Sequence, residues 1–333
     1  GNMAMDVTDW VHPDVAELAA LAARIVGLDI AGVDLVAQDI SKPMKAQGAA
    51  IVEVNAGPGL LMHLKPATGS ARPVGQAIAA HLFAEDSEPR IPVVGLIGND
   101  NTTGTSHLIA WLLHLQGLQT GLASAKGLFL GQRCLQQQNG MEWESAQRLL
   151  INRSVQAAVF ETTARHLLAE GLPYDRCQVG VITSMPKAEG LQDLYIHSDE
   201  QMPNVIRTQM DVVLPQGMAV LNAEDPEVAN LAQFCDGEVT YFASSEDHPL
   251  IAQHRSENGR VVFWRKNHLV LAQGDQEIDA LNRQLPAIDK LFKNQHLKCV
   301  EVLAASATAW ALGINTDLIR AGIKSFGQSP GAH

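Results

Sequence analysis

The sequence has little of several features that mark particular classes of protein. Its four cysteines, Cys134, Cys177, Cys235 and Cys299, are far apart and match no metal-binding or CxxC spacing. We therefore expect reduced thiols in a cytoplasmic protein. The twelve histidines form no HxxxH or HExxH pair, which disfavours a zinc site.

Long apolar runs and basic runs are also absent. No stretch of apolar residues reaches the length of about 18 that a membrane-spanning helix needs. The opening GNMAMDVTDWVHPD has neither the basic nor the apolar segment of a signal peptide. The formal net charge is −12 and no run of five Lys or Arg occurs, so a basic nucleic-acid-binding surface is not expected. We expect neither a membrane nor a nucleic acid as partner.

The composition is that of a globular protein, and its 333 residues are enough for two domains at about 100–200 residues each. Hydrophobic periodicity predicts an initial group of elements. They are a helix at 13–27, an antiparallel strand pair at 32–40 and 49–57, and a helix at 74–83. The charged AEDSEPR at 84–90 then predicts a linker. We place one domain at 1–85 and a second at 90–328.

From Ile91 onward, short buried strands alternate with helices. The predicted strands are 91–97, 120–125, 157–162, 179–184, 217–225 and 238–244, and the helices are 103–116, 143–151, 163–170 and 199–211. This alternation predicts an α/β fold with a mostly parallel sheet and helices on both faces. An antiparallel pair around Lys266 and Asn267 and a helical tail at 296–326 complete the pattern.

The stretch VVGLIGNDNTTGTSHLIAWLLHLQG, residues 93–117, is typical of a phosphate-binding turn. An apolar strand leads into Gly98, a polar loop follows, and an amphipathic helix begins. The position at which a lysine normally meets the phosphates is occupied by Thr102. Asn101 tolerates a positive φ, and Asp100 would repel a phosphate at the same helix N-terminus. The turn has the architecture of a P-loop without its cation.

The order of several motifs resembles one family. The stretches are AMDVTDWVHPD, VGLDIAGVDLVAQDIS, IVEVNAGPGLLMHLKPATGSARPVG, RIPVVGLIGN, EGLPYDRCQVGVIT and VLNAEDP. Together they are similar to cyanophycin synthetases, which join an ATP-grasp ligase to a Mur-ligase-like module. The resemblance implies that residues 1–85 are a small α+β fragment from the C-terminal end of an ATP-grasp domain. It implies a Mur-ligase-like central domain at 90–328, and amide-bond formation that uses ATP and Mg²⁺.

Asp34, Glu53 and Asn55 match the metal ligands of ATP-grasp enzymes. Residues i and i+2 of a strand share a face, so Glu53 and Asn55 can point together, and Asp34 can reach them from the paired strand. Oxygen ligands of this kind suit Mg²⁺. Alternatively, these side chains are only the polar surface of an exposed hairpin. Weaker candidates for phosphate or substrate contacts are Arg24, Arg72, His63 and Lys65.

The resemblance also implies an ATP site in the second domain, and several of its residues are replaced. Mur ligases carry a G-T-N-G-K-T-T loop, whereas this chain has Gly98, Asn101, Thr102 and Thr103 at the corresponding positions. A lost attraction or an added repulsion at about 4 Å is worth roughly 4 kcal/mol. The magnesium ligand Glu161 is retained. Three further motifs are altered: the one that contains Glu161 now ends in Arg165-His166, the next spans Thr183 to Glu189, and the third reads His296-Leu297-Lys298.

Three hypotheses follow. The second domain is a degenerate module that serves as a scaffold, and we assign it no catalytic residue. Alternatively, it is an active amide ligase in which Lys126 replaces the missing ammonium, or a module that binds a small molecule or peptide in the cleft at the strand ends. The resemblance implies the missing ATP-grasp half and identical subunits as partners, and an amino acid or peptide as substrate.

Overall fold

The chain forms two units. The computed structural model describes residues 3–83, 90–138, 140–284, 289, 292 and 297–326. One unit is Gly1–Pro89 and the other is Arg90–His333. The predicted linker at 84–90 lies outside the described residues except for Arg90, as do His296 and the end of the predicted second domain.

The first unit is a two-stranded sheet with short helices. Its elements are η1 (Thr8–Trp10), α1 (Pro13–Val26), β1 (Gly32–Val36), α2 (Met44–Gln47), β2 (Ala50–Asn55), α3 (Leu61–Leu64) and α4 (Val74–Leu82). Helix α1 begins at a proline and ends at Gly27, which has φ 84° and closes the helix in the left-handed region. Strands β1 and β2 are antiparallel, as the sequence predicts.

The first unit has a very small apolar core. Within its described part, Val15 and Met44 are the buried hydrophobic side chains. Large apolar side chains are exposed instead, among them Trp10, Ile25 and Leu61.

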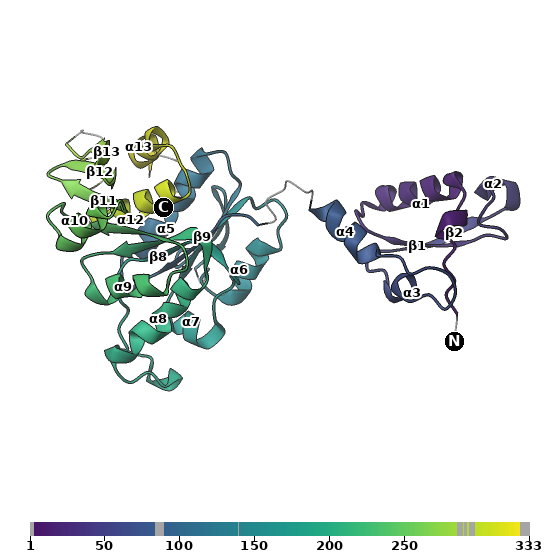
Figure 1. The fold of residues 1–333 in the computed structure, drawn as a ribbon, viewed down its shortest axis with the longest axis horizontal. Helices are drawn as coiled ribbons and strands as arrows, with labels where there is room; N and C mark the ends of the chain where they lie inside the picture. Colours follow the sequence, from purple (N-terminus) through teal and green to yellow (C-terminus); the bar gives the residue numbers. More distant parts are fainter. Residues whose placement is uncertain are drawn as a thin grey trace. The chain divides into compact units, whose positions relative to one another are not determined.

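The second unit contains a mixed sheet of eleven strands (Figure 1). In sequence order they are β3 (Val93–Ile97), β4 (Thr120–Ser124), β5 (Gly127–Leu130), β6 (Arg133–Gln137), β7 (Ala157–Thr162), β8 (Cys177–Ile182), β9 (Val213–Asn222), β10 (Glu238–Ala243), β11 (Arg260–Arg265), β12 (His268–Gln273) and β13 (Gln276–Asn282). The order across the sheet is β13-β12-β11-β10-β9-β8-β3-β7-β4-β5-β6. In this order, neighbouring strands are parallel from β11 across the centre of the sheet to β4. At each edge of the sheet the last two strands form an antiparallel hairpin. The predicted α/β class is confirmed.

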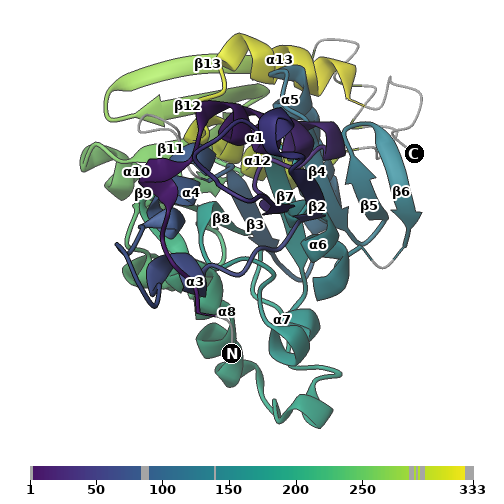
Figure 2. The same ribbon diagram turned by 90° about the vertical axis from the view of Figure 1, so that its right-hand side faces the viewer.

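Helices cover both faces of this sheet (Figures 1 and 2). On one face lie α5 (Thr102–Leu115), α12 (Cys299–Ala311) and α13 (Thr316–Ser325). On the other lie α6 (Trp143–Leu150), α7 (Ala164–Glu170), α8 (Met202–Asp211), α9 (Pro226–Asn230) and α10 (Pro249–Ser256). Short 3₁₀ turns are η2 (Gln192–Leu194), η3 (Asp199–Gln201) and η4 (Leu231–Phe234). No helix in the described ranges has the length and apolarity to cross a membrane.

The structure adds strands that periodicity alone does not predict. The segment between the predicted strand 120–125 and the predicted helix 143–151 contains the antiparallel strands β5 and β6. Strand β6 is mostly exposed, so it lacks the buried alternation that marks a strand in sequence. Strand β13 extends the predicted pair around Lys266 into a three-stranded meander.

Candidate functional site

The phosphate-type turn connects β3 to α5 in the second unit. Gly98 follows β3 directly, and a Cβ there would lie 2.1 Å from the hydroxyl of Thr183. Asn101 immediately precedes α5 with φ 61° and ψ 15°, in the left-handed region that asparagine tolerates. The turn therefore follows a tight path, and Asn101 takes a left-handed conformation that glycine more often supplies.

The buried carboxylate of Glu161 accepts hydrogen bonds from four groups of the protein. The hydroxyls of Thr102 and Thr103 each donate to Oε1 at 2.7 Å. Oε2 accepts from the Ala125 amide at 3.1 Å and, at 3.4 Å, from the Ser106 hydroxyl, whose proton is shared with the Thr103 carbonyl at 3.0 Å. Glu161 is only 4% exposed, so these donors replace the water that a free carboxylate would bind. Both oxygens are satisfied by the turn and by the end of β4.

The backbone of the turn is bound to the end of β8. The amides of Asn99 and Asp100 approach the Ser184 hydroxyl at 3.0 and 3.4 Å. The hydroxyl of Thr183 donates to the Asp100 carbonyl at 2.9 Å. In a working phosphate loop, such amides point to the ligand. Here two of them already have a partner in the protein.

Lys126 lies beside the turn. Its neighbour Ala125 donates to Glu161, and Lys126 also acts electrostatically on His107 and Glu301. Burial, and secondarily the charge of Lys126, lowers the pKa of His107 to about 4. Burial raises the pKa of Glu301. The sequence singles out Lys126 but misses His107 and Glu301, whose only signal is polarity on otherwise apolar helices.

Gly104 brings Glu301 against the first turn of α5. A Cβ on Gly104 would lie 2.4 Å from Glu301 Cδ, so only glycine leaves space for this carboxylate. Glu301 is 8% exposed and accepts a 2.6 Å hydrogen bond from the Lys298 amide. The altered motif at residues 296–298 thus contributes a backbone donor to a buried acid, while His296 itself lies outside the described residues.

Arg165, in the altered motif that follows Glu161, binds a neighbouring loop. Its guanidinium donates to both Asp193 carboxylate oxygens, at 3.0 and 2.8 Å, and to the Gly190 carbonyl at 2.5 Å. This bidentate pair holds the excursion between β8 and α8. Arg165 is therefore occupied by protein groups.

In the first unit, the predicted metal ligands lie together. Asp34 of β1 is the cross-strand partner of Glu53 of β2, and the Asn55 amide reaches the Asp34 carboxylate at 3.5 Å. The register shifts directly after this pair, because Asp34 faces Glu53 while Leu35 faces Ile51. Val52 is therefore the extra residue of a β-bulge. Both carboxylates are exposed, and neither forms an ion pair with the described residues.

The weaker candidates of the first unit differ in their surroundings. Arg72 bonds Asp6 at 2.9 Å and Asp9 at 2.6 Å, and its hydrogen bond lowers the pKa of Asp6 well below the usual range. The other three candidates are exposed: Arg24 lies on α1, His63 on α3, and Lys65 directly after α3. Arg72 thus has a structural role in joining the N-terminal segment to the rest of this unit.

The described residues contain no group of three or more His, Cys, Asp or Glu side chains that could hold a metal ion. The oxygen set of the first unit consists of two carboxylates and one amide, which suits Mg²⁺ in ligand type and leaves other positions to phosphates and water. In the second unit, Glu161 is the single residue predicted as a metal ligand.

Comparisons with known proteins agree with this architecture. The chain is 35% identical over 335 residues to a cyanophycin synthetase from Geminocystis herdmanii, covering 100% of this chain and 38% of that protein. It is 33% identical over 327 residues to one from Synechocystis sp., covering 98% of this chain and 37% of that protein. The chain therefore spans a little over a third of the length of these relatives. No protein-family profile matches it.

A solved structure with a similar fold is that of a UDP-N-acetylmuramoyl-L-alanyl-D-glutamate–2,6-diaminopimelate ligase. Its TM-score is 0.51 at 13% identity, covering 75% of this chain and 49% of that chain. At this identity the likeness concerns the fold, and it agrees with the parallel sheet and its two helical layers.

Proposed function

The chain belongs to the cyanophycin synthetase family, as its Mur-ligase-like region, and on that premise we propose that its second unit is a scaffold that binds no nucleotide. In this proposal the complete protein forms amide bonds with ATP elsewhere. The observation that carries the proposal is the state of Glu161, whose two oxygens accept four hydrogen bonds from the protein. A magnesium ion would have to displace the hydroxyls of Thr102 and Thr103.

The charge of the turn supports the same proposal. Residues 98–104 contain no basic side chain and carry the negative charge of Asp100. At about 4 Å and an effective dielectric near 20, one unit charge contributes roughly 4 kcal/mol to the energy of a phosphate. Helix α5 still offers amides at its N-terminus, but in the turn before it the amides of Asn99 and Asp100 already have the Ser184 hydroxyl as partner. The turn therefore lacks the main sources of triphosphate affinity.

In the first unit, Asp34, Glu53 and Asn55 would hold Mg²⁺ in the complete protein. The bound ion would neutralise phosphate charge during acyl-phosphate formation. The direct opposition of Asp34 and Glu53 supports this role, because like charges in a cross-strand pair are destabilising unless a cation lies between them. We propose that residues 1–85 belong to an ATP-grasp domain and 90–328 to a Mur central domain.

The missing ATP-grasp half is the proposed partner of the first unit. Its described apolar side chains are mostly exposed, and Val15 and Met44 alone do not make a core for an independent domain. The matched relatives extend well beyond the matched region, which leaves room for that half. We expect it to cover exposed side chains such as Trp10, Ile25 and Leu61.

Thermal unfolding with Mg-ATP tests the scaffold proposal. A site with a Kd near 50 μM would stabilise the protein by about 2.7 kcal/mol in about 5 mM Mg-ATP. For a unit of this size, that corresponds to a rise of roughly 5–10 °C in melting temperature. We expect no rise beyond that given by the same concentration of magnesium sulfate. A nucleotide-specific rise in the second unit would refute the proposal.

The position of Lys126 favours one alternative, an active ligase with a rearranged turn. Lys126 directly follows Ala125, whose amide donates to Glu161. Lys126 is therefore the basic residue best placed to bring its ammonium to a phosphate in the turn. If Mg-ATP does stabilise the second unit, Lys126→Ala should abolish that effect, whereas Lys266→Ala, which removes an exposed lysine from the turn between β11 and β12, should not. Nucleotide binding that is insensitive to Lys126→Ala would rule out this alternative.

A further inference from the structure

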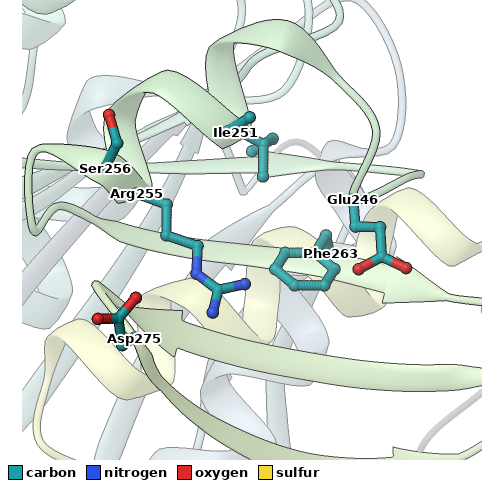
Figure 3. Close-up of a pocket in the computed structure, with 7 residues that line it drawn as sticks. Glu246, Ile251, Arg255, Ser256, Phe263 and Asp275 are labelled. Atoms are coloured by element: carbon teal, nitrogen blue, oxygen red, sulfur yellow. The ribbon is translucent and has the colours of Figure 1, made fainter.

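A slot of about 300 Å³ lies beneath α10, away from the phosphate-type turn (Figure 3). Helix α10 contributes Ile251, Arg255 and Ser256, β11 contributes Phe263, and the turn between β12 and β13 contributes Asp275. The slot forms where the parallel strands give way to the antiparallel meander. Its volume is at the lower end of the range for small-molecule sites, about 300–1,000 Å³.

Arg255 is fixed in this slot by groups on the meander. Its Nε donates to the Gly274 carbonyl at 2.6 Å, and its Nη1 pairs with Glu277 at 2.6 Å. Glu277 also accepts two hydrogen bonds from Arg265, at 2.7 and 2.8 Å. These bonds, those of Arg265 first, lower the pKa of Glu277 to about 2. The guanidinium of Arg255 is therefore oriented before any ligand arrives.

Arg255 and Asp275 both retain hydrogen-bonding capacity. A guanidinium has five N–H groups, and the bonds to Gly274 and Glu277 use two of them. Asp275 forms no hydrogen bond or ion pair with the residues that the structure describes, although Figure 3 shows its carboxylate facing the Arg255 guanidinium across the slot. The slot thus presents a donor group and an acceptor group of opposite charge side by side.

The rest of the lining is mixed. Ile251 and Phe263 are apolar and are 1% and 0% exposed, and Phe263 lies on the side of Arg255 opposite to Asp275 (Figure 3). Glu246 also lines the slot, and its carboxylate is paired with Arg265. An inorganic anion on Arg255 would be repelled by Asp275 and Glu277. A simple cation on Asp275 would be repelled by Arg255. A zwitterion with an apolar body satisfies both charged groups and the wall.

We propose that this slot binds a free α-amino acid with an apolar side chain. Its carboxylate pairs with Arg255, its ammonium pairs with Asp275, and its side chain lies against Ile251 and Phe263. The site is independent of the phosphate-type turn, so it stands whether or not the second unit binds nucleotide.

Calorimetric titration of the chain with L-leucine and L-methionine tests the proposal. N-acetyl-L-leucine lacks the ammonium and L-leucinamide lacks the carboxylate. Each removes one charge-assisted contact, so we expect each to bind at least about tenfold more weakly than L-leucine. The proposal is overturned if neither amino acid gives saturable binding up to about 10 mM. Equal affinity for either analogue also overturns it.

Two variants separate the site from general charge effects. Asp275→Asn should weaken L-leucine binding at least about tenfold, and it removes no existing hydrogen bond with the described residues. Asp236→Asn removes an equal charge from an exposed position before β10 and should leave binding unchanged. Arg255→Lys keeps the charge but loses the planar fork, so it should also weaken binding. Equal binding by the Asp275 and Asp236 variants would refute the assignment.

Discussion

The hydroxyl of Thr102 donates a 2.7 Å hydrogen bond to the carboxylate of Glu161, 59 positions further along the chain. In the proposed correspondence with the Mur-type motif, Thr102 takes the place of the lysine and Glu161 that of the magnesium ligand. In this structure the two side chains bind each other instead. Thr103 repeats the contact on the same oxygen.

Thr102→Val should destabilise the second unit. The change keeps the side-chain shape and removes one hydrogen bond to a buried carboxylate, while three other donors remain on Glu161. We expect a loss of about 1.5 kcal/mol in the free energy of unfolding, measured by urea denaturation. Thr208→Val, at an exposed position of α8, should change it by less than about 0.5 kcal/mol. Equal values for the two variants would show that the contact contributes nothing.

Gly104→Ala should also be destabilising, although alanine favours a helix by about 1 kcal/mol over glycine. The new Cβ would lie 2.4 Å from Glu301 Cδ, and overpacking of this kind costs about 1–3 kcal/mol. In a Glu301→Ala background the steric conflict is absent, so the same change should become stabilising. The four proteins form a double-mutant cycle measured by urea denaturation. Additive effects would contradict the predicted contact.

His107 should make stability depend on pH. Burial and Lys126 lower its pKa from 6.5 to about 4, so between these values the unfolded chain binds more protons than the folded one. The stability that comes from keeping His107 neutral is fully present above pH 6.5. The free energy of unfolding then falls by about 3 kcal/mol in total as the pH falls toward 4. Between pH 6.5 and 4, the parent should lose up to about 3 kcal/mol of unfolding free energy relative to His107→Gln, whose side chain does not titrate. A constant difference would exclude this role.

Asp34→Asn should stabilise the first unit in the absence of metal. The change removes the like-charge opposition to Glu53, for which we expect a gain of about 0.2–1 kcal/mol. Glu17→Gln, on the exposed face of α1, removes the same charge without a cross-strand partner and serves as the control. In the complete protein, Asp34→Asn should instead reduce ATP-dependent ligation. A loss of stability in the isolated chain would mean that Asp34 has a favourable partner.

The sequence predicts the parallel strands well because they are short, apolar and followed by helices. It also allows Asn101 its left-handed conformation, which the structure has. Strand β5 escapes prediction because its burial depends on neighbours across the sheet, and β6 because it is mostly exposed. The same limit applies to the site. That Thr102 is not lysine is visible in the sequence, but the donation by Ser106 and Ala125 to Glu161 depends on three distant segments meeting.

Glu301 illustrates what sequence reasoning could have used. It is an acidic residue in the first turn of α12, where a carboxylate favours the helix N-terminus, so its burial is not evident from the sequence. Gly104 is the second half of the signal, because a glycine inside a helix costs stability unless something needs the space. The slot beneath α10 is harder to predict from the sequence, because its walls come from a helix, a strand and a turn whose contacts are set by the meander.

The hydroxyl contacts on Glu161 also bear on whether a phosphate site could be engineered into this turn. A Thr102→Lys substitution would remove one of these donors, while Asp100 and the Ser184 bonds to the backbone would remain. Under the scaffold proposal, a lysine at this position alone would therefore cost stability before any phosphate contact formed. Nucleotide binding through this turn would require several coordinated substitutions.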